Sequence, residues 1–173
     1  MAFEPRVLVD LFGDMMKRVE LDLSNKFNDV QKPFYHYGHT QELINDLLAK
    51  SNSNVDRFPL VYLLQDFDED YNVEDHRVQY EANVVIYIIN HTDANFKVTD
   101  RYEQVFKQTL YPIYQTLIQN LATYKHFGFP IARVPHTKTD LLYWGNGAAN
   151  FSNDAIDAIR ITNLNIPVMK NKC

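Results

Sequence analysis

The segment from about Val78 to Asn90 narrows the possible folds of this chain more than any other feature of its sequence. Apolar side chains occupy every second position from Val78 to Ile88, with polar side chains between them at first and apolar ones between them near the end. A period of two is typical of a β-strand, because successive side chains point to opposite faces of a sheet. The pattern predicts a long strand that begins half exposed and ends covered on both faces.

Other hydrophobic patterns predict the elements that accompany this strand. Apolar residues three or four positions apart predict helices over about residues 4–24, 40–50 and 100–125. Short apolar runs between turn signals predict strands over residues 58–64, 139–144 and about 155–168. This order predicts an α+β fold, in which a mainly antiparallel sheet of about four strands packs against a long helix and an N-terminal helix.

Two local irregularities interrupt these patterns. Pro112 lies inside the predicted long helix and has no backbone N–H to donate, which costs about 3 kcal/mol and predicts a kink. The apolar pattern continues past this proline, so we expect tertiary packing to hold the helix together. In the last predicted strand the alternation slips by one position near Thr162 and Asn163, which predicts a β-bulge.

Length and composition predict a single domain spanning residues 1–173. The chain is 46% hydrophobic, which is enough for one sizeable core, and it is too short for two domains. It contains 5 glycines, whereas ordinary usage gives roughly 12, and it has no Walker or dinucleotide-binding motif. Folds that hold phosphates in glycine-rich loops are therefore disfavoured.

The net charge and the cysteine content limit the binding partners and the cellular compartment that we expect for this chain. A net charge of −5 provides no overall positive field to attract a polyanion such as DNA. The only cysteine, Cys173, excludes an internal disulfide and suits a reducing compartment. The first residues do not resemble a signal peptide, and no apolar stretch is long enough to span a membrane. We therefore expect a soluble chain that does not bind membranes.

Histidines and carboxylates form only weak candidates for a metal site. His36 and His39, together with the acidic stretch at 66–70, offer nitrogen and oxygen atoms that can bind a metal ion. No third ligand follows the two histidines at a defined spacing. Packed or surface imidazoles are the favoured interpretation.

The alternation of acidic residues at positions 66, 68 and 70 is similar to the start of a calcium-binding loop. The positions that need a glycine and a bidentate glutamate hold Tyr71 and Arg77 instead. We expect a solvated acidic connection over residues 66–72.

No motif of nucleophilic or acid–base catalysis is present, so the sequence predicts no enzyme, no cofactor and no metal. An enzyme with an acidic site at residues 66–70 is the disfavoured alternative.

The order of the predicted elements resembles that of the small tail-completion or tail-terminator proteins of tailed bacteriophages. Residues 99–107, 110–114 and 37–39 are further similar to neck proteins of phages that infect gut Bacteroidetes, including crAss-like phages. The resemblance covers most of the chain by element order and brings no catalytic residue with it.

This resemblance implies a structural virion protein with a tail-terminator-like fold. Copies would form a ring of about six or twelve subunits at the neck or upper tail, using two different complementary surfaces on each subunit. The ring would join portal, connector or tail proteins and surround a DNA conduit without sequence-specific binding, after assembly in the cytoplasm of the bacterial host. A small cytoplasmic adaptor that binds a protein partner without catalysis is the alternative.

Three weakly patterned regions are the expected contact surfaces of such a ring: residues 34–39, the acidic loop at 66–74 and the turn at 145–151. Their aromatic and polar side chains suit protein contacts. The candidate contact residues are Phe34, Tyr35, Tyr37, His39, Asp66, Asp68, Glu69, Asp70, Trp144, Asn146 and Phe151.

Overall fold

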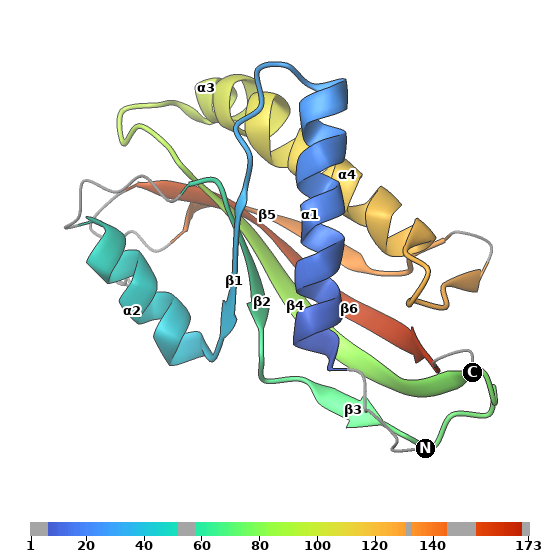
Figure 1. Ribbon diagram of the computed structural model, residues 1–173. Helices are drawn as coiled ribbons and strands as arrows, with labels where there is room; N and C mark the ends of the chain where they lie inside the picture. The colour runs from blue at the N-terminus through green and yellow to red at the C-terminus, as the bar shows by residue number, and fades with distance from the viewer. Residues whose placement is uncertain (1–6, 52–57, 131–132, 145–154, 171–173) are drawn as a thin grey trace.

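The computed structural model describes residues 7–51, 58–130, 133–144 and 155–170, in which a mostly antiparallel six-stranded sheet is packed between helices (Figure 1). The strands are β1 (Phe34–Gly38), β2 (Leu60–Leu64), β3 (Asp68–Asp70), β4 (Val78–His91), β5 (Thr137–Trp144) and β6 (Ile156–Met169). The strand order is β1-β2-β4-β6-β5, with β3 beside β4. The helices are α1 (Leu8–Lys26), α2 (Thr40–Ser51), and the consecutive α3 (Val98–Arg101), η1 (Tyr102–Leu110) and α4 (Tyr111–Thr123).

β4 and β6 form the centre of the sheet and pair antiparallel over almost their whole length. On one face of β4, Tyr80 is fully buried, whereas Asn83 on the other face is exposed. Near the end of the strand, Ile88 and Ile89 on opposite faces are both fully buried. The predicted long strand and its end covered on both faces are confirmed, whereas its first residues are not half exposed as expected, because Gln79 is buried as well as Val78 and Tyr80.

One face of the sheet is covered by α1 and by the helical run from α3 to α4 (Figure 1). Phe12 of α1 and Phe106 of η1 are fully buried in the main core, together with inward-facing residues of β2, β4 and β6. Nδ2 of Asn120 in α4 donates to the Asp22 carboxylate of α1 at 2.8 Å, which links the two helices directly. The expected packing of a long helix and an N-terminal helix on the sheet is confirmed.

Among the described residues, α2 covers one end of the opposite face. Leu43 of α2 packs there with Phe58, Tyr62 and Ile89 in a smaller cluster. Farther along this face, Asn83 of β4 is exposed to solvent. This half of the sheet surface is therefore polar.

A change of helix type accompanies the proline in the long helix. η1 is π-helical and ends at Leu110, and the next N–H, that of Tyr111, donates to the carbonyl of Phe106 five residues earlier. Pro112 then occupies the first turn of α4, where a missing N–H is tolerated. The π-helical hydrogen bonds therefore lie directly before the position at which a proline would otherwise interrupt the regular series of α-helical hydrogen bonds.

Two strands were not predicted, and the expected count of four was too low. Residues 34–38, expected from the sequence to belong to a weakly patterned contact region and to no strand, form β1 and pair parallel to β2. Residues 68–70, expected to be part of a solvated connection, form β3 and pair with β4. Neither shows an alternating hydrophobic pattern, because β1 lies at the edge of the sheet and all three β3 side chains are exposed. Because β1 and β2 are parallel and the other pairs are antiparallel, the sheet is mixed and, as predicted, mainly antiparallel.

The β-bulge predicted near Thr162 and Asn163 is confirmed. Val84 of β4 lies opposite Leu164 of β6, and Ile86 lies opposite Ile161, so β6 carries one extra residue. Asn163 has a φ of 51°, a left-handed conformation that asparagine tolerates better than most residues.

Candidate interaction surface

The outer edge of β1 is the clearest interaction surface that the structure describes. The N–H of Phe34 donates to the Pro59 carbonyl at 2.8 Å, and the Gly38 carbonyl accepts from the N–H of Gln65 at 2.9 Å. In a parallel pair the residues that bond to the neighbouring strand alternate with residues that face away from it. The backbone groups of Tyr35 and Tyr37 therefore point to the open edge, where no described strand pairs with them.

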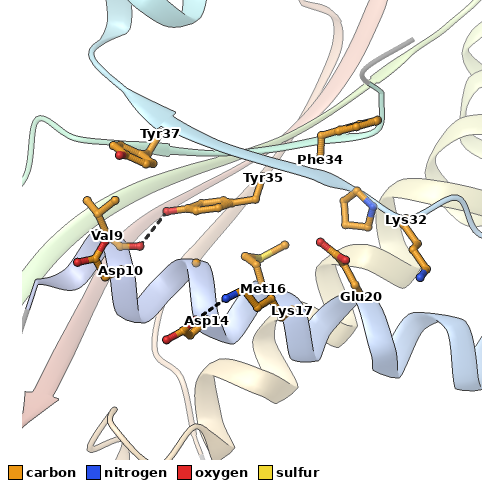
Figure 2. A pocket seen from close by; sticks show the side chains of 12 residues that line it. Val9, Asp10, Asp14, Met16, Lys17, Glu20, Lys32, Phe34, Tyr35 and Tyr37 are labelled. Atoms are coloured by element: carbon orange, nitrogen blue, oxygen red, sulfur yellow. Dashed lines mark hydrogen bonds and ion pairs between the residues drawn. The ribbon is translucent and has the colours of Figure 1, made fainter. Parts of the chain in front are cut away.

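A groove of about 830 Å³ runs between this edge and α1 (Figure 2). The Tyr35 ring lies across the groove toward α1, and its hydroxyl donates to the Val9 carbonyl over 3.4 Å. The Tyr35 ring packs close to Gly13 of α1, where an added Cβ would lie 3.4 Å from Cε1 of Tyr35, an ordinary contact distance. Burial raises the pKa of the Tyr35 hydroxyl above its ordinary value.

Aromatic side chains gather along β1. The Tyr35 ring lies 5.5 Å from that of Phe12 and 6.2 Å from that of Tyr37, between ring centroids. Phe34 is 45% exposed and Tyr37 is 42% exposed. Exposed aromatic groups beside an unpaired strand edge are typical of a protein contact surface.

The helix wall of the groove is acidic. Asp10, Asp14 and Glu20 line it together with Lys17, and Lys32 lies on the strand side. Lys17 donates to Asp14 at 2.8 Å, and this pair lowers the pKa of Asp14 and raises that of Lys17. Asp10 and Glu20 add further negative charge to this wall.

At the end of β1, Nδ1 of His39 pairs with the carboxylate of Asp66, which follows β2. The hydrogen bond and charge of Asp66 raise the pKa of His39. The backbone N–H of His39 also donates to Oε2 of Glu42 at 3.0 Å, so this residue joins β1 to the start of α2. The structure thus brings together two predicted contact residues that are distant in sequence.

The acidic residues of β3 separate onto two faces. Asp68 and Asp70 lie with Glu81 around a hollow of about 370 Å³ on the polar half of the sheet, which three asparagines complete: Asn83, Asn163 and Asn165. Glu69 does not line this hollow and accepts a hydrogen bond from the Tyr71 hydroxyl at 2.8 Å. The predicted acidic region is therefore two surfaces rather than one.

Trp144, at the end of β5, stacks on Tyr87 of β4 with ring centroids 4.8 Å apart and planes 9° from parallel. Both rings border a cavity of about 80 Å³ beneath α2. The other two predicted residues of this region, Asn146 and Phe151, lie outside the described residues.

Within the described ranges, no group of three or more histidines, cysteines or carboxylates is arranged to hold a metal ion. His36 packs edge-on against Tyr62 at 5.6 Å, while His39 pairs with Asp66. No helix in the described part of the chain is long and apolar enough to cross a membrane.

The acidic wall of the groove was missed by sequence reasoning. Asp10, Asp14 and Glu20 occupy the polar side of a helix, which alone is typical of a solvated face. Only the position of β1 beside α1 makes these residues part of a site. The amphipathic pattern of residues 8–23 was the one available signal.

The chain matches no protein-family model and no curated protein sequence.

Proposed function

We propose that this protein is a structural subunit of a tailed bacteriophage, with a tail-terminator-like fold, whose copies close into a ring at the neck or upper tail. The ring joins portal or connector layers to the tail and surrounds the conduit for DNA. The phage assignment comes from the sequence resemblance, and the surface geometry supports the ring.

The observation that carries the proposal is that the order of described strands ends in two unlike strands, β1 on one side and β5 on the other, with the short β3 paired beside β4. Among the described strands, β1 pairs only with β2 and β5 pairs only with β6. A ring built from identical subunits needs two different surfaces on each copy, so that every contact is head to tail. An unpaired strand edge is a ready template for pairing with another chain.

Charge supports a passive role toward DNA. The chain carries a net charge of −5, and its hollow at Asp68, Asp70 and Glu81 is acidic. A channel wall with this charge repels the phosphate backbone and lets DNA slide past without sequence-specific binding. The protein would then be assembled in the host cytoplasm and retained in the virion.

Quantitative mass spectrometry of purified phage particles tests this function. We expect about six or twelve copies of the chain per particle, counted against the major capsid protein, as a closed ring requires. Absence of the chain from complete particles would overturn the proposal.

The alternative is a cytoplasmic adaptor that uses the groove beside β1 to bind an extended segment of another protein. The open backbone at Tyr35 and Tyr37 is the observation that favours it. Native mass spectrometry of the purified chain distinguishes the two: a ring supports the structural role, and a monomer or dimer at all concentrations supports the adaptor.

A further inference from the structure

The groove beside β1 is suited to receive a strand. Backbone groups of Tyr35 and Tyr37 point outward along the open edge, and the α1 wall stands next to them. Any strand that pairs with this edge also places side chains against α1. Strand addition next to a helix supplies affinity through the backbone and specificity through the side chains.

The opposite edge of the sheet carries a net charge of +1, from Arg133, Lys138 and Asp140, which is opposite in sign to that of the acidic wall. We define the β5 edge as residues 133–144, which contain β5 and the exposed Arg133. Nζ of Lys138 lies 4.8 Å from the centroid of the Tyr111 ring in α4. Lys138 therefore lies on the side of the sheet that carries α1 and α4. Its partner Asp140 also binds the Tyr111 hydroxyl, at 2.7 Å.

We infer that the β1 edge of one copy receives the β5 edge of the next copy, so that the sheets of adjacent subunits become continuous. In this arrangement Arg133 and Lys138 of one subunit face the acidic wall, at Asp10 and Glu20, of its neighbour. The inference rests on the proposed ring, whose contact it identifies. Pairing of β1 with β1 would instead be two-fold symmetric and would stop at a dimer.

Cross-linking between two single-cysteine chains tests this contact. In a Cys173→Ser background, one chain carries Phe34→Cys on β1 and the other carries Thr139→Cys on β5. Treatment of the mixture with a flexible bismaleimide is expected to give cross-linked dimers, whereas either chain alone gives few. A chain with both cysteines is expected to give a ladder that ends at the ring size.

The matched control replaces Thr139→Cys with Asn83→Cys, which places the thiol on the exposed face of β4, the middle strand of the order β1-β2-β4-β6-β5. This pair is expected to cross-link no more than the single chains do. Equal cross-linking of the control pair, cross-links with Phe34→Cys alone, or none in the β1 and β5 mixture would overturn the inference.

Charge reversal gives an independent readout. The double variant Asp10→Lys with Glu20→Lys is expected to shift the native mass spectrum from rings to monomers. The control, Asp29→Lys with Glu103→Lys, makes the same change in charge at exposed positions that do not line the groove. A circular dichroism melt verifies that both variants fold.

The failure of this inference can be distinguished from the failure of the ring function. If the unmodified chain forms rings but the β1 and β5 mixture gives no cross-links, the proposed contact between β1 and β5 is wrong, whereas the proposed ring is still supported. If the unmodified chain is monomeric and absent from particles, both are wrong.

Discussion

Arg101 of α3 and Asp157 of β6 form an ion pair that is completely buried, with Nη1 2.7 Å from Oδ1 and neither side chain exposed. The same guanidinium donates from Nη2 to the Asp93 carbonyl at 3.0 Å and from Nε to the Phe96 carbonyl at 3.3 Å. Arg101 thus links the loop between β4 and α3 to β6 of the central sheet.

Removal of one partner of this pair is expected to be costly. Asp157→Ala leaves a buried guanidinium without its carboxylate and should lower the free energy of unfolding by about 3 to 5 kcal/mol, measured by urea denaturation. The double variant Arg101→Met with Asp157→Leu should cost less than the sum of the single variants, because no unpaired charge remains. Additive costs would contradict this account.

Phe106 tests the packing of the long helix on the sheet. Its side chain is fully buried in the main core, so Phe106→Ala should lower the free energy of unfolding by about 3 to 5 kcal/mol in the same measurement. The neighbouring Gln108 is exposed, and Gln108→Ala should have little effect. A loss below about 1 kcal/mol for Phe106→Ala would mean that another face of the helix packs inward.

Gly38 is expected to resist substitution. It has a φ of 157°, and an added Cβ would overlap Oε2 of Glu42 and lie 2.5 Å from the Tyr62 hydroxyl oxygen. Gly38→Ala should therefore destabilise the protein by about 1 to 3 kcal/mol. Gly13→Ala is the matched control and should cost less, since its Cβ would meet only the Tyr35 ring, at 3.4 Å. Equal thermal shifts for the two variants would contradict the prediction.

The pairing of His39 with Asp66 predicts a pH dependence. Asp66 raises the pKa of His39 above the ordinary value of 6.5. Because the folded-state pKa is the higher one, the pair contributes its full stability below about pH 6.5 and loses it as the pH rises through the folded-state pKa. The NMR titration of His39 should have a midpoint above 6.5, and Asp66→Asn should lower that midpoint. Equal midpoints in both proteins would show that the pair does not persist in solution.

The acidic residues of β3 are expected to affect assembly rather than folding. Charge reversal at Asp68, Glu69 and Asp70 removes exposed carboxylates, which contribute little to stability. If these residues contact a neighbouring protein in the particle, their reversal should reduce the yield of complete virions, because interface charges fix register. Plaque titres and circular dichroism of the variant measure the two effects. Unchanged titres would exclude a role of β3 in assembly.

The parts of the fold with strong periodicity were predictable. The long strand β4, helix α1 and the helical run that contains Phe106 were identified because each buries one regular set of side chains. The bulge at Asn163 was also predictable, since a slip in alternation is visible in the sequence itself. These features depend on local patterns.

The groove and its edge strand were not predictable in this way. β1 owes its conformation to backbone pairing with β2, a contact between segments separated by the whole of α2. Its exposed aromatic side chains give no alternation, and the acidic residues of α1 are ordinary for a solvated helix face. Tertiary contact alone brings Tyr35 and Asp10 to one surface.

The stacking of Trp144 on Tyr87 gives the protein an intrinsic optical probe. Trp144 is the only tryptophan in the chain, so selectively excited tryptophan fluorescence comes entirely from the end of β5. Its emission reports the polarity at one edge of the sheet without an attached dye. Subunit association at that edge is thus measurable in the unmodified protein by a shift in emission wavelength with concentration.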